Sequence, residues 1–566
     1  MAEFAELMTR EGETLTGDPW QSYPRPSMRR ENWQNLNGTW EFTVSQGEKP
    51  PESFERQILV PFPPESILSG IHQVFDGKLA RFYRRRFSLP ENFRRGRVLL
   101  HFGGVDQSCR VYLNGALLGS HTGGYAGFSF DITDRVAEEN TLLLRVTDDP
   151  ENTTLPYGKQ RSKRGGMWYT PISGIWQTVW LEAVPKTYIA GMKIHSRGNQ
   201  VAIAFQGIRQ GTIHLEEREI PIREGKAEFC VENPRYWSPE DPWLYAFSAV
   251  SGEDRVESYF ALRDLDIRKV NGTPRLCLNG KPYFFHGVLD QGYWSDGLLT
   301  PASESAMEAD ILTMKKLGFN TLRKHIKVEP EWFYYTCDRL GMIVFQDMVN
   351  NGNYRFLADT ALPTLGFQSR ISDRRMHRDP GTRQAFRRGM EETVAFLENH
   401  PCVCYWTIFN EGWGQFNSQE MYAALKALDP TRFVDTTSGW FRCGARDVES
   451  VHTYFQRFRY RSGKRPVVLS EFGGYVWKVE EHSFHLGKTY GYRFYPDKKS
   501  FMDALERLYR EKILPAAAQG LSGAIYTQLS DVEDETNGLL TYDRKVLKVD
   551  GQRMRAIARA LSGETE

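Results

Sequence analysis

Hydrophobic and polar positions along the chain follow three successive patterns. Over residues 1–185, short apolar-rich segments such as 38–45 and 97–105 recur with almost no helical periodicity. Short segments of this kind, separated by Gly and Asn, are typical of β-strands joined by turns. The pair Asn114-Gly115 lies between two apolar-rich arms and favours a type I′ hairpin. The first pattern predicts an N-terminal jelly-roll sandwich.

The second pattern covers residues 186–265 and consists of shorter strand-like segments with even spacing. Two of them are VAIAFQGI (201–208) and KAEFCVE (226–232). About 80 residues of this kind predict a small immunoglobulin-like β-sandwich, with a scaffolding role rather than a site.

In the third pattern, over residues 266–566, strand-like and helix-like segments alternate. Eight segments are predicted strands: 283–291, 319–327, 342–349, 403–411, 432–439, 448–454, 466–474 and 522–531. Amphipathic segments predict helices at 303–318, 381–400, 418–428, 500–514 and 551–561. Because the connections after the fifth and sixth strands are short, we expect their helices to be degenerate. Eight units over about 300 residues predict a C-terminal catalytic (β/α)8 TIM barrel. The alternative is an open doubly wound sheet, but no glycine-rich phosphate loop follows the first strand.

Composition limits the partners of the protein. Basic and acidic residues number 72 and 71, so no large single-sign field is available to attract nucleic acid or an anionic membrane. The N-terminal segment is acidic and polar, unlike a signal peptide, and no stretch approaches ~18 consecutive apolar residues. The seven Cys are irregularly spaced, which suggests neither a disulfide framework nor a metal site. We expect a cytoplasmic protein, and a homo-oligomer is compatible with the sequence.

Polar residues gather where the predicted barrel strands end. The carboxyl ends of barrel strands meet on one face, and that face carries the chemistry. The residues of this kind are Asp290, Gln291, Arg323, His325, Lys327, Asp347, Asn410, Glu411, His452, Tyr454, Glu471, Tyr526, Gln528, Asp531 and Glu533. Their number predicts a polar floor around a cleft.

Two glutamates stand out because each ends an apolar strand. Glu411 follows YWTIFN on the fourth predicted strand, and Glu471 follows VVLS on the seventh. Two carboxylates that face each other across a small gap suit glycoside hydrolysis, one as proton donor and one as nucleophile. Glu411 must start protonated, and burial beside Trp406 or Trp413 would favour that form.

Neighbouring residues suggest supporting roles. Arg323 could keep Glu471 ionised through a charge-assisted hydrogen bond, and Tyr454 could donate to the same carboxylate. Asn410 carries a donor for a sugar hydroxyl beside the reacting carbon.

Each role has a structural alternative. Glu411 could cap the segment that follows it, and Glu471 could pair with Lys478 or Arg323. The strand-end residues His325, Lys327 and His452 could simply be satisfied by neighbours. Four tryptophans are either sugar platforms or core residues: Trp294, Trp413, Trp440 and Trp477.

Several motifs now coincide in order and spacing with a known family. In the first region they include LNGTWEF, FYRRRFSLP and GMWYTPISGIWQTVWLE, and in the barrel GFNTLRKHI, FYYTCDRLGMIVFQD, WTIFNEGW and VVLSEFGG. Over nearly its whole length the chain resembles glycoside hydrolase family 2, the group of β-galactosidases, β-glucuronidases and β-mannosidases.

The resemblance implies a sugar-binding role for the jelly roll and retaining hydrolysis in the barrel. It implies Glu411 as acid/base, Glu471 as nucleophile, Arg323 as the barrel arginine, Asn410 as the substrate-side amide and Tyr454 as the contact of the nucleophile. No organic cofactor is implied.

Three departures from the family bear on specificity. Tyr526 stands where many members have Trp. The Asn-x-Lys of the family's β-glucuronidases is missing, since Gly538 and Leu539 follow Asn537, which argues against glucuronidase activity. Large β-galactosidases carry further C-terminal domains and a divalent metal. The acidic segment 531–535 could hold a metal, but solvated loop acids are the alternative.

We therefore expect an exo-acting retaining β-glycosidase of the β-galactosidase type. Loops of the jelly roll near Trp168 and Tyr169 would narrow the pocket. The alternatives are another terminal sugar (β-mannoside, arabinopyranoside or galactofuranoside) and a carbohydrate-binding protein without catalysis.

Overall fold

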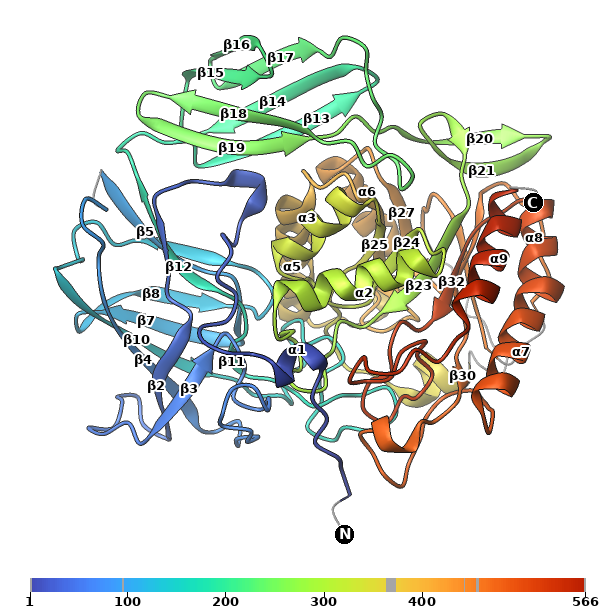
Figure 1. Ribbon diagram of the computed structural model, residues 1–566, viewed down its shortest axis with the longest axis horizontal. Coiled ribbons are helices and arrows are strands. Elements are labelled where there is room, and N and C mark those ends of the chain that lie inside the picture. Colours follow the sequence, from blue (N-terminus) through green and yellow to red (C-terminus); the bar gives the residue numbers. More distant parts are fainter. Residues whose placement is uncertain (1–2, 94–95, 363–372, 442, 455–457, 564–566) are drawn as a thin grey trace.

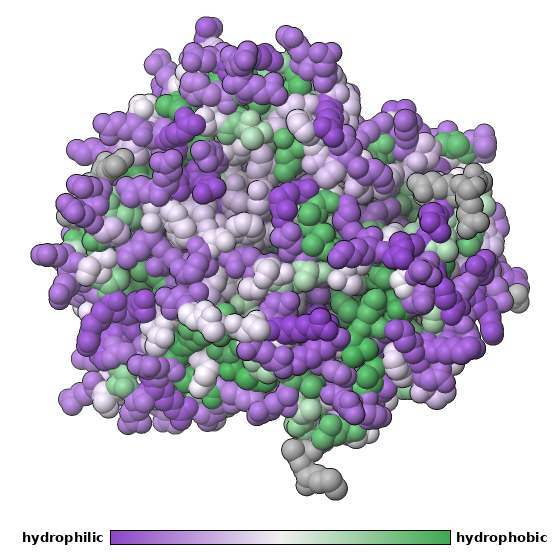
Figure 2. Space-filling model, in the orientation of Figure 1, coloured by the Kyte–Doolittle hydropathy of each residue, from purple (hydrophilic) through white to green (hydrophobic). Residues whose placement is uncertain are grey.

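The computed structural model describes residues 3–93, 96–362, 373–441, 443–454 and 458–563. Its parts follow the order of the three sequence patterns. Figure 1 shows the first part (blue to teal) beside the barrel, the second (teal to green) above it and the barrel (green to red) at the centre. Polar side chains cover most of the visible face (Figure 2). No helix among the described residues combines the length and apolar character needed to cross a membrane.

The first part is a two-sheet β-sandwich. One sheet has the order β1-β12-β5-β9: Trp33–Asn35, Val179–Val184, Arg97–Phe102 and Phe128–Asp131. The other has the order β3-β2-β4-β10-β7-β8: Arg56–Val60, Gly38–Ser45, Ala80–Ser88, Glu139–Thr147, Ser108–Leu113 and Ala116–Thr122. Buried apolar side chains of both sheets form one core. The β7–β8 hairpin turns at Asn114 and Gly115, both with positive φ (51° and 82°), which confirms the predicted turn.

The second part has seven strands with antiparallel neighbours in a single hydrogen-bonded order, β13-β14-β17-β16-β15-β18-β19. They are Gly191–Arg197, Gln200–Gln206, Lys226–Cys230, Arg218–Arg223, Gln210–Leu215, Tyr245–Ser251 and Asp254–Phe260. Arg30 joins this part to the sandwich, because it pairs with Glu182 at 3.1 Å and with Asp254 at 3.0 Å. An immunoglobulin-like topology stays a prediction.

Eight parallel strands form the barrel, as the sequence predicts. Their order is β27-β26-β25-β24-β23-β32-β29-β28: Phe433–Ser438, Val403–Asn410, Ile343–Asp347, Thr321–Lys324, Phe285–Asp290, Leu521–Thr527, Val467–Gly473 and Glu449–Thr453. The terminal strands β27 and β28 meet where Ser438 Oγ lies 3.1 Å from Ser450 Oγ, which closes the ring. A small sheet of β20 to β22 precedes the barrel: Leu265–Val270, Thr273–Leu278 and Lys281–Pro282.

Helices surround the barrel. They are α2 (Glu304–Lys316), α3 (Glu331–Leu340), α5 (Pro380–Leu397), α6 (Ser418–Leu428), α7 (Lys498–Leu508), α8 (Leu514–Gln519) and α9 (Gly551–Ser562). Five of them, α2, α5, α6, α7 and α9, lie close to predicted ranges, whereas α3 and α8 had no predicted range of their own. Polar N-caps start several of them; Ser303, for example, accepts from the Ala306 amide. As expected, no helix follows β27 or β28 in the described parts of those connections.

Aromatic rings fill one end of the barrel. Phe345 lies 4.1 Å from Tyr405 and 5.3 Å from Phe285, between ring centroids. Because strand side chains alternate, residues two positions further on these strands point to the same interior nearer the carboxyl ends. The carboxyl ends of the strands therefore stand on a rigid apolar base.

Candidate active site

Arg323 of β24 organises the carboxyl end of the barrel. It is almost fully buried and donates to four groups within 3.0 Å. Their acceptors are Asp347 Oδ1 (3.0 Å), Asn410 Oδ1 (2.9 Å), Glu471 Oε1 (2.9 Å) and the Ser470 carbonyl (3.0 Å). A guanidinium is the side chain suited to this, because its five donors lie in one rigid plane. Arg323 thus fixes side chains from three other strands.

Glu471 of β29 is held as a carboxylate. Arg323 and the Tyr454 hydroxyl both donate to it, one to each oxygen. Burial alone would raise the pKa of Glu471, but His452, followed by Arg323, His325 and the hydrogen bond from Tyr454, outweighs burial and lowers the pKa to about 2. Glu471 is therefore ionised over the whole neutral range, as a nucleophile requires.

Glu411 faces Glu471 from the residue after β26. Its backbone has φ 54°, a left-handed conformation that costs a non-glycine residue of the order of 1–2 kcal/mol. Its amide donates to the Ser438 carbonyl (2.8 Å), which holds the turn in place. Gly439 leaves room for the side chain, since a Cβ there would lie 3.3 Å from Glu411 Cγ. The strand end therefore turns Glu411 into the barrel mouth.

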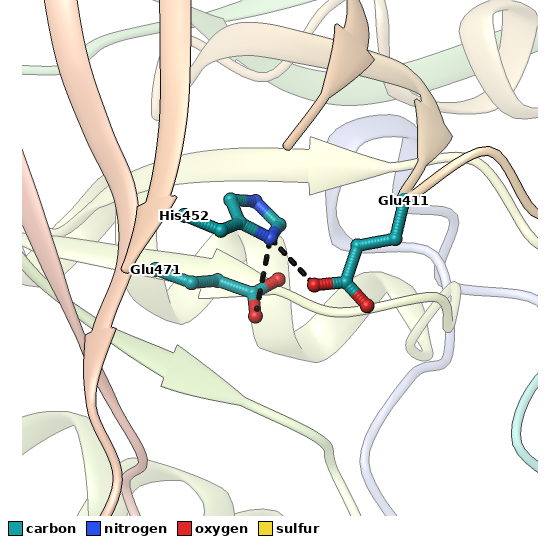
Figure 3. A group of neighbouring side chains, drawn as sticks. All are labelled: Glu411, His452 and Glu471. Carbon is teal, nitrogen blue, oxygen red and sulfur yellow. Dashed lines mark hydrogen bonds and ion pairs between the residues drawn. The ribbon is translucent and has the colours of Figure 1, made fainter. Parts of the chain in front are cut away.

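His452 of β28 lies between the two glutamates (Figure 3). Its Nδ1 is 2.8 Å from Glu411 Oε1 and 3.6 Å from Glu471 Oε2. Arg323 Nη1, which can only donate, lies 3.5 Å from Nε2. We therefore assign the proton to Nδ1, which donates to Glu411. One carboxylate oxygen of Glu411 lies within 4.8 Å of one carboxylate oxygen of Glu471.

Two aromatic and polar groups complete the floor of the site. His325 Nδ1 lies 2.6 Å from Asp347 Oδ2, and burial lowers the pKa of His325. The Trp440 ring lies 5.5 Å from the His452 ring, in an edge-on arrangement. His325 and His452, which the sequence predicted as site residues, thus both lie near Glu471.

A loop of the sandwich reaches the barrel mouth, where the sequence predicted a narrowing. The Trp168 ring lies 4.8 Å from the Trp413 ring, and Trp413 Nε1 donates to the Tyr157 hydroxyl (3.2 Å). Tyr169 donates to Glu535 Oε2, and Gln528 Nε2 contacts the same oxygen at 3.3 Å. The site is therefore built from two parts of the chain.

Three predicted site residues, Asp290, Tyr526 and Trp294, lie elsewhere. Asp290 pairs with Lys324 at 2.6 Å on the outer side of the strands, because Lys324 is the neighbour of the inward-facing Arg323. Tyr526 likewise points to the outer side of its strand, where it packs on Phe472. Trp294 lies under the Arg544 guanidinium, 4.2 Å from its centre. Gln291 is buried, and its Oε1 accepts no hydrogen bond within the described residues. Trp406, expected beside Glu411, instead donates to Asp429 at 2.8 Å.

Several residues of the site carry no recognisable sequence signal. Ser438 lies 2.9 Å from His452 Nε2. Burial and, to a smaller extent, the charge of the neighbouring Glu471 raise the pKa of Glu535. Lys159 acts electrostatically on both Glu535 and His325. Lys159 is more than 300 residues away in sequence from Glu535, so pattern alone could not bring them together.

One group among the described residues has the spacing of a cation site, and it is the cluster Glu411, His452 and Glu471. Hydrogen bonds within the protein already account for its atoms, since Nδ1 of His452 carries a proton toward Glu411. The acidic segment 531–535 is likewise engaged: Asp531 pairs with Lys548 (2.8 Å) and Glu533 with Arg164 (2.9 Å). The cluster of Glu411, His452 and Glu471 is thus arranged for proton transfer, and the ion pairs of segment 531–535 hold this segment against its neighbours.

The family of the chain follows from comparison with family models. Residues 269–472 match the model described as "Glycosyl hydrolases family 2, TIM barrel domain", and residues 77–171 match "Glycosyl hydrolase 2 galactose-binding domain-like". A barrel with an acidic pair at its mouth and an N-terminal sandwich defines the same class. The chain belongs to glycoside hydrolase family 2.

Individual relatives are similar at low identity. A β-galactosidase of Thermoanaerobacter pseudethanolicus is 23% identical over 72% of this chain and 56% of its own length. A β-glucuronidase of Felis catus is 26% identical over 80% of this chain and 79% of its own. This chain thus spans little more than half of the first relative.

Solved structures show the same fold. A β-D-glucuronidase for Dictyoglomus thermophilum has a TM-score of 0.72 at 18% identity, covering 95% of this chain and 98% of that one. A β-galacturonidase from Eisenbergiella tayi has a TM-score of 0.67 at 18% identity, covering 96% and 99%. At such identity the likeness concerns the fold alone.

Tyr454→Phe tests the electrostatics of the site. Losing the hydroxyl removes one of the contacts that lower the pKa of Glu471, so this pKa should rise by about one unit. A nucleophile is active only when ionised, so activity falls as pH drops through its pKa. The acidic limb of kcat/KM should therefore move to higher pH in the variant.

The measurement is kcat/KM from about pH 1.5 to 8, with circular dichroism at each pH to confirm that the protein is folded. Tyr422→Phe is the matched control, because its hydroxyl donates to Asp447 (2.7 Å) outside the barrel mouth. An unchanged acidic limb in Tyr454→Phe would contradict the assignment. Glu471 also contributes stability that is present above its unfolded pKa near 4.5 and is lost as pH falls toward 2.

Proposed function

We propose that this chain is a retaining exo-β-glycosidase that removes terminal β-linked sugars, of the β-galactosidase type. The facing pair of Glu411 and Glu471 carries the proposal. Carboxyl groups about 5–5.5 Å apart are typical of retaining enzymes, whereas inversion needs about 6.5–9.5 Å to admit a water. One oxygen of each glutamate lies within 4.8 Å of one oxygen of the other, so the two carboxyl groups face each other at short range.

The first step uses the two glutamates in different protonation states. Glu471, fixed and ionised by Arg323, attacks the anomeric carbon. Glu411 protonates the leaving oxygen; since His452 donates to Oε1, the acidic proton belongs on Oε2. The products are the released alcohol and a covalent glycosyl-enzyme on Glu471.

In the second step the same residues act in reverse. Glu411, now a carboxylate, takes a proton from water, and the water oxygen attacks the anomeric carbon. The bond to Glu471 breaks, and the sugar leaves with its original configuration. Asn410, aligned by Arg323, is placed to hold a sugar hydroxyl beside the reacting carbon. The docked sandwich loop supports exo action, because it walls one side of the mouth.

Two alternatives remain from the sequence. Another terminal sugar (β-mannoside, arabinopyranoside or galactofuranoside) would use the same glutamates. A carbohydrate-binding protein without catalysis has little need for a carboxylate with a pKa near 2 beside a second glutamate. A β-glucuronide is disfavoured by Gly538 and Leu539 after Asn537.

A panel of 4-nitrophenyl glycosides tests the proposed function. Galactoside, mannoside, arabinopyranoside, galactofuranoside, glucuronide and galacturonide are compared by kcat/KM, and proton NMR follows the anomer released first. We expect the β-galactoside to be the best substrate and the β-anomer to appear first. Hydrolysis of none of these, together with measurable sugar binding, would favour the binding protein.

Glu411→Ala separates the acid role from the nucleophile role. Without a proton donor, substrates with poor leaving groups should lose about 10²–10⁴-fold in kcat/KM, whereas 2,4-dinitrophenyl glycosides should keep a fast first step. A rapid release of about one equivalent of dinitrophenol in stopped flow would show this. Equal losses for both classes of leaving group would contradict the acid assignment.

A further inference from the structure

A lysine of the sandwich lies at the barrel mouth, and the backbone around it fixes its place. The amides of Tyr157 and Gly158 donate to the Asn350 carbonyl (3.0 and 3.4 Å), just beyond β25. Gly158 lies so close to the barrel that an added Cβ would be 3.1 Å from the Ile326 carbonyl, just beyond β24. The next residue, Lys159, therefore lies over the carboxyl ends of these two strands.

Lys159 is buried there without a fixed partner. Its exposed fraction is 8%, and no hydrogen bond or ion pair joins its Nζ to another residue within the described ranges. Its charge nevertheless lowers the pKa of Glu535 and of His325, so the ammonium faces the site. A buried ammonium needs hydrogen-bond acceptors once water is excluded. A bound substrate would supply them.

Glu535 lies beside Gln528, the residue that follows β32 at the carboxyl end of the barrel. Tyr169 and Gln528 both contact its Oε2, and its exposed fraction is 5%. Burial and, less strongly, the charge of Glu471 raise the pKa of Glu535, and burial together with the charges of Glu411, Glu535 and Glu471 raises the pKa of Tyr492. Glu535 is thus near the reacting pair, and the charge of Lys159 acts on it.

We propose that Lys159 and Glu535 form a sugar-binding pair in which Lys159 donates to one hydroxyl of the terminal sugar and Glu535 accepts from another, and that this pair selects a neutral sugar over a uronic acid. A cation and an anion together present a donor and an acceptor without net charge. Because Lys159 is balanced by Glu535, no spare cation is left for a sugar carboxylate, and a uronic acid whose carboxylate lies against Glu535 would meet repulsion from Glu535 and Glu471. The proposal rests on the proposed glycosidase function and names the substrate class of that site.

A substrate series tests the contact made by Lys159. Wild type and Lys159→Met are compared on 4-nitrophenyl β-D-galactopyranoside and its 3-, 4- and 6-deoxy analogues, or on the same series of the neutral sugar that the wild type prefers. Lys159→Met should lower kcat/KM for the parent sugar about 10- to 100-fold. With the wild type, at least one deoxy analogue should have a lower kcat/KM than the parent sugar. With Lys159→Met, that analogue and the parent sugar should have similar kcat/KM, because the missing hydroxyl is the partner of the missing ammonium.

Lys163→Met is the matched control, since Lys163 is an exposed lysine of the same loop. It should stay within about twofold of the wild type. The contact would be contradicted if Lys159→Met and Lys163→Met had the same effect. It would also be contradicted if, for every deoxy analogue, the loss from the missing hydroxyl and the loss from Lys159→Met multiplied. Thermal unfolding of all variants excludes a folding defect as the cause.

Glu535→Gln tests the selection against acidic sugars. Glutamine keeps acceptors for Tyr169 and Gln528 but removes the charge. The ratio of kcat/KM for galacturonide over galactoside should rise about tenfold or more. An unchanged ratio, or a wild type that prefers a uronide, overturns the selection while leaving the glycosidase function intact. A wild type that hydrolyses no glycoside overturns the proposed function itself.

Discussion

Replacing Glu471 with Gly is expected to abolish hydrolysis, lowering kcat about 10⁴- to 10⁶-fold. Glu471 would form the covalent bond to the sugar, so its loss removes the reaction path rather than one contact. Arg323 and Tyr454 would lose their acceptor, but the Asp347 and Asn410 contacts of Arg323 would remain. The variant should therefore stay folded, which the free energy of unfolding in urea checks.

Added azide should rescue this variant in a way that reports stereochemistry. Azide is small enough to enter the space vacated by the carboxylate and attacks the anomeric carbon from that side. The product should be the inverted glycosyl azide, identified by proton NMR on a substrate with a good leaving group. Near-normal activity of Glu471→Gly without azide would contradict the nucleophile assignment.

Replacing Arg323 with Met should have the second largest effect, on both activity and stability. The guanidinium is the fixed cation that pairs with Asp347 and Glu471, both buried. Breaking a buried pair by removing one partner costs about 3–5 kcal/mol, because the other charge stays behind. The free energy of unfolding should fall by about that amount, and kcat/KM by about 10³-fold as Glu471 loses its orientation.

Two further variants interpret this result. Arg339→Met removes an exposed partner of Glu308 (2.8 Å) and should cost no more than about 1 kcal/mol. Arg323→Lys keeps the charge but not the planar fork, so it should recover part of the stability and little of the activity. An Arg323→Met protein within about tenfold of wild-type activity would contradict the central role of Arg323.

The barrel was predictable because its signals are local and repeated. Eight apolar segments and their helices could be placed from periodicity, and the largest boundary differences concern the 500–514 helix, which is interrupted at Tyr509–Ile513. The Asn114-Gly115 turn is equally local. The single seven-stranded order of the second part was not predictable, since short alternating strands do not specify which neighbours pair.

The site was predictable where side-chain alternation is regular, as at Arg323, Asn410 and Glu471. Reading every polar strand end as inward-facing fails for Asp290 and Tyr526, because a shift of one residue turns a side chain to the outer surface. Lys159 and Glu535 were beyond reach for a different reason. Their proximity depends on how the sandwich docks on the barrel, and no local pattern encodes that docking.

The most direct test of the account is covalent trapping of the nucleophile. The protein is incubated with a 2-deoxy-2-fluoro-β-glycosyl fluoride of its preferred sugar, which slows both steps but leaves the fluoride as a good leaving group. Intact mass and peptide mapping by mass spectrometry then locate the label. We expect one sugar per chain, attached to Glu471, and we expect an added acceptor alcohol to release this sugar. A label on any other residue, or time-dependent turnover without a covalent species and with an inverted product, would contradict it.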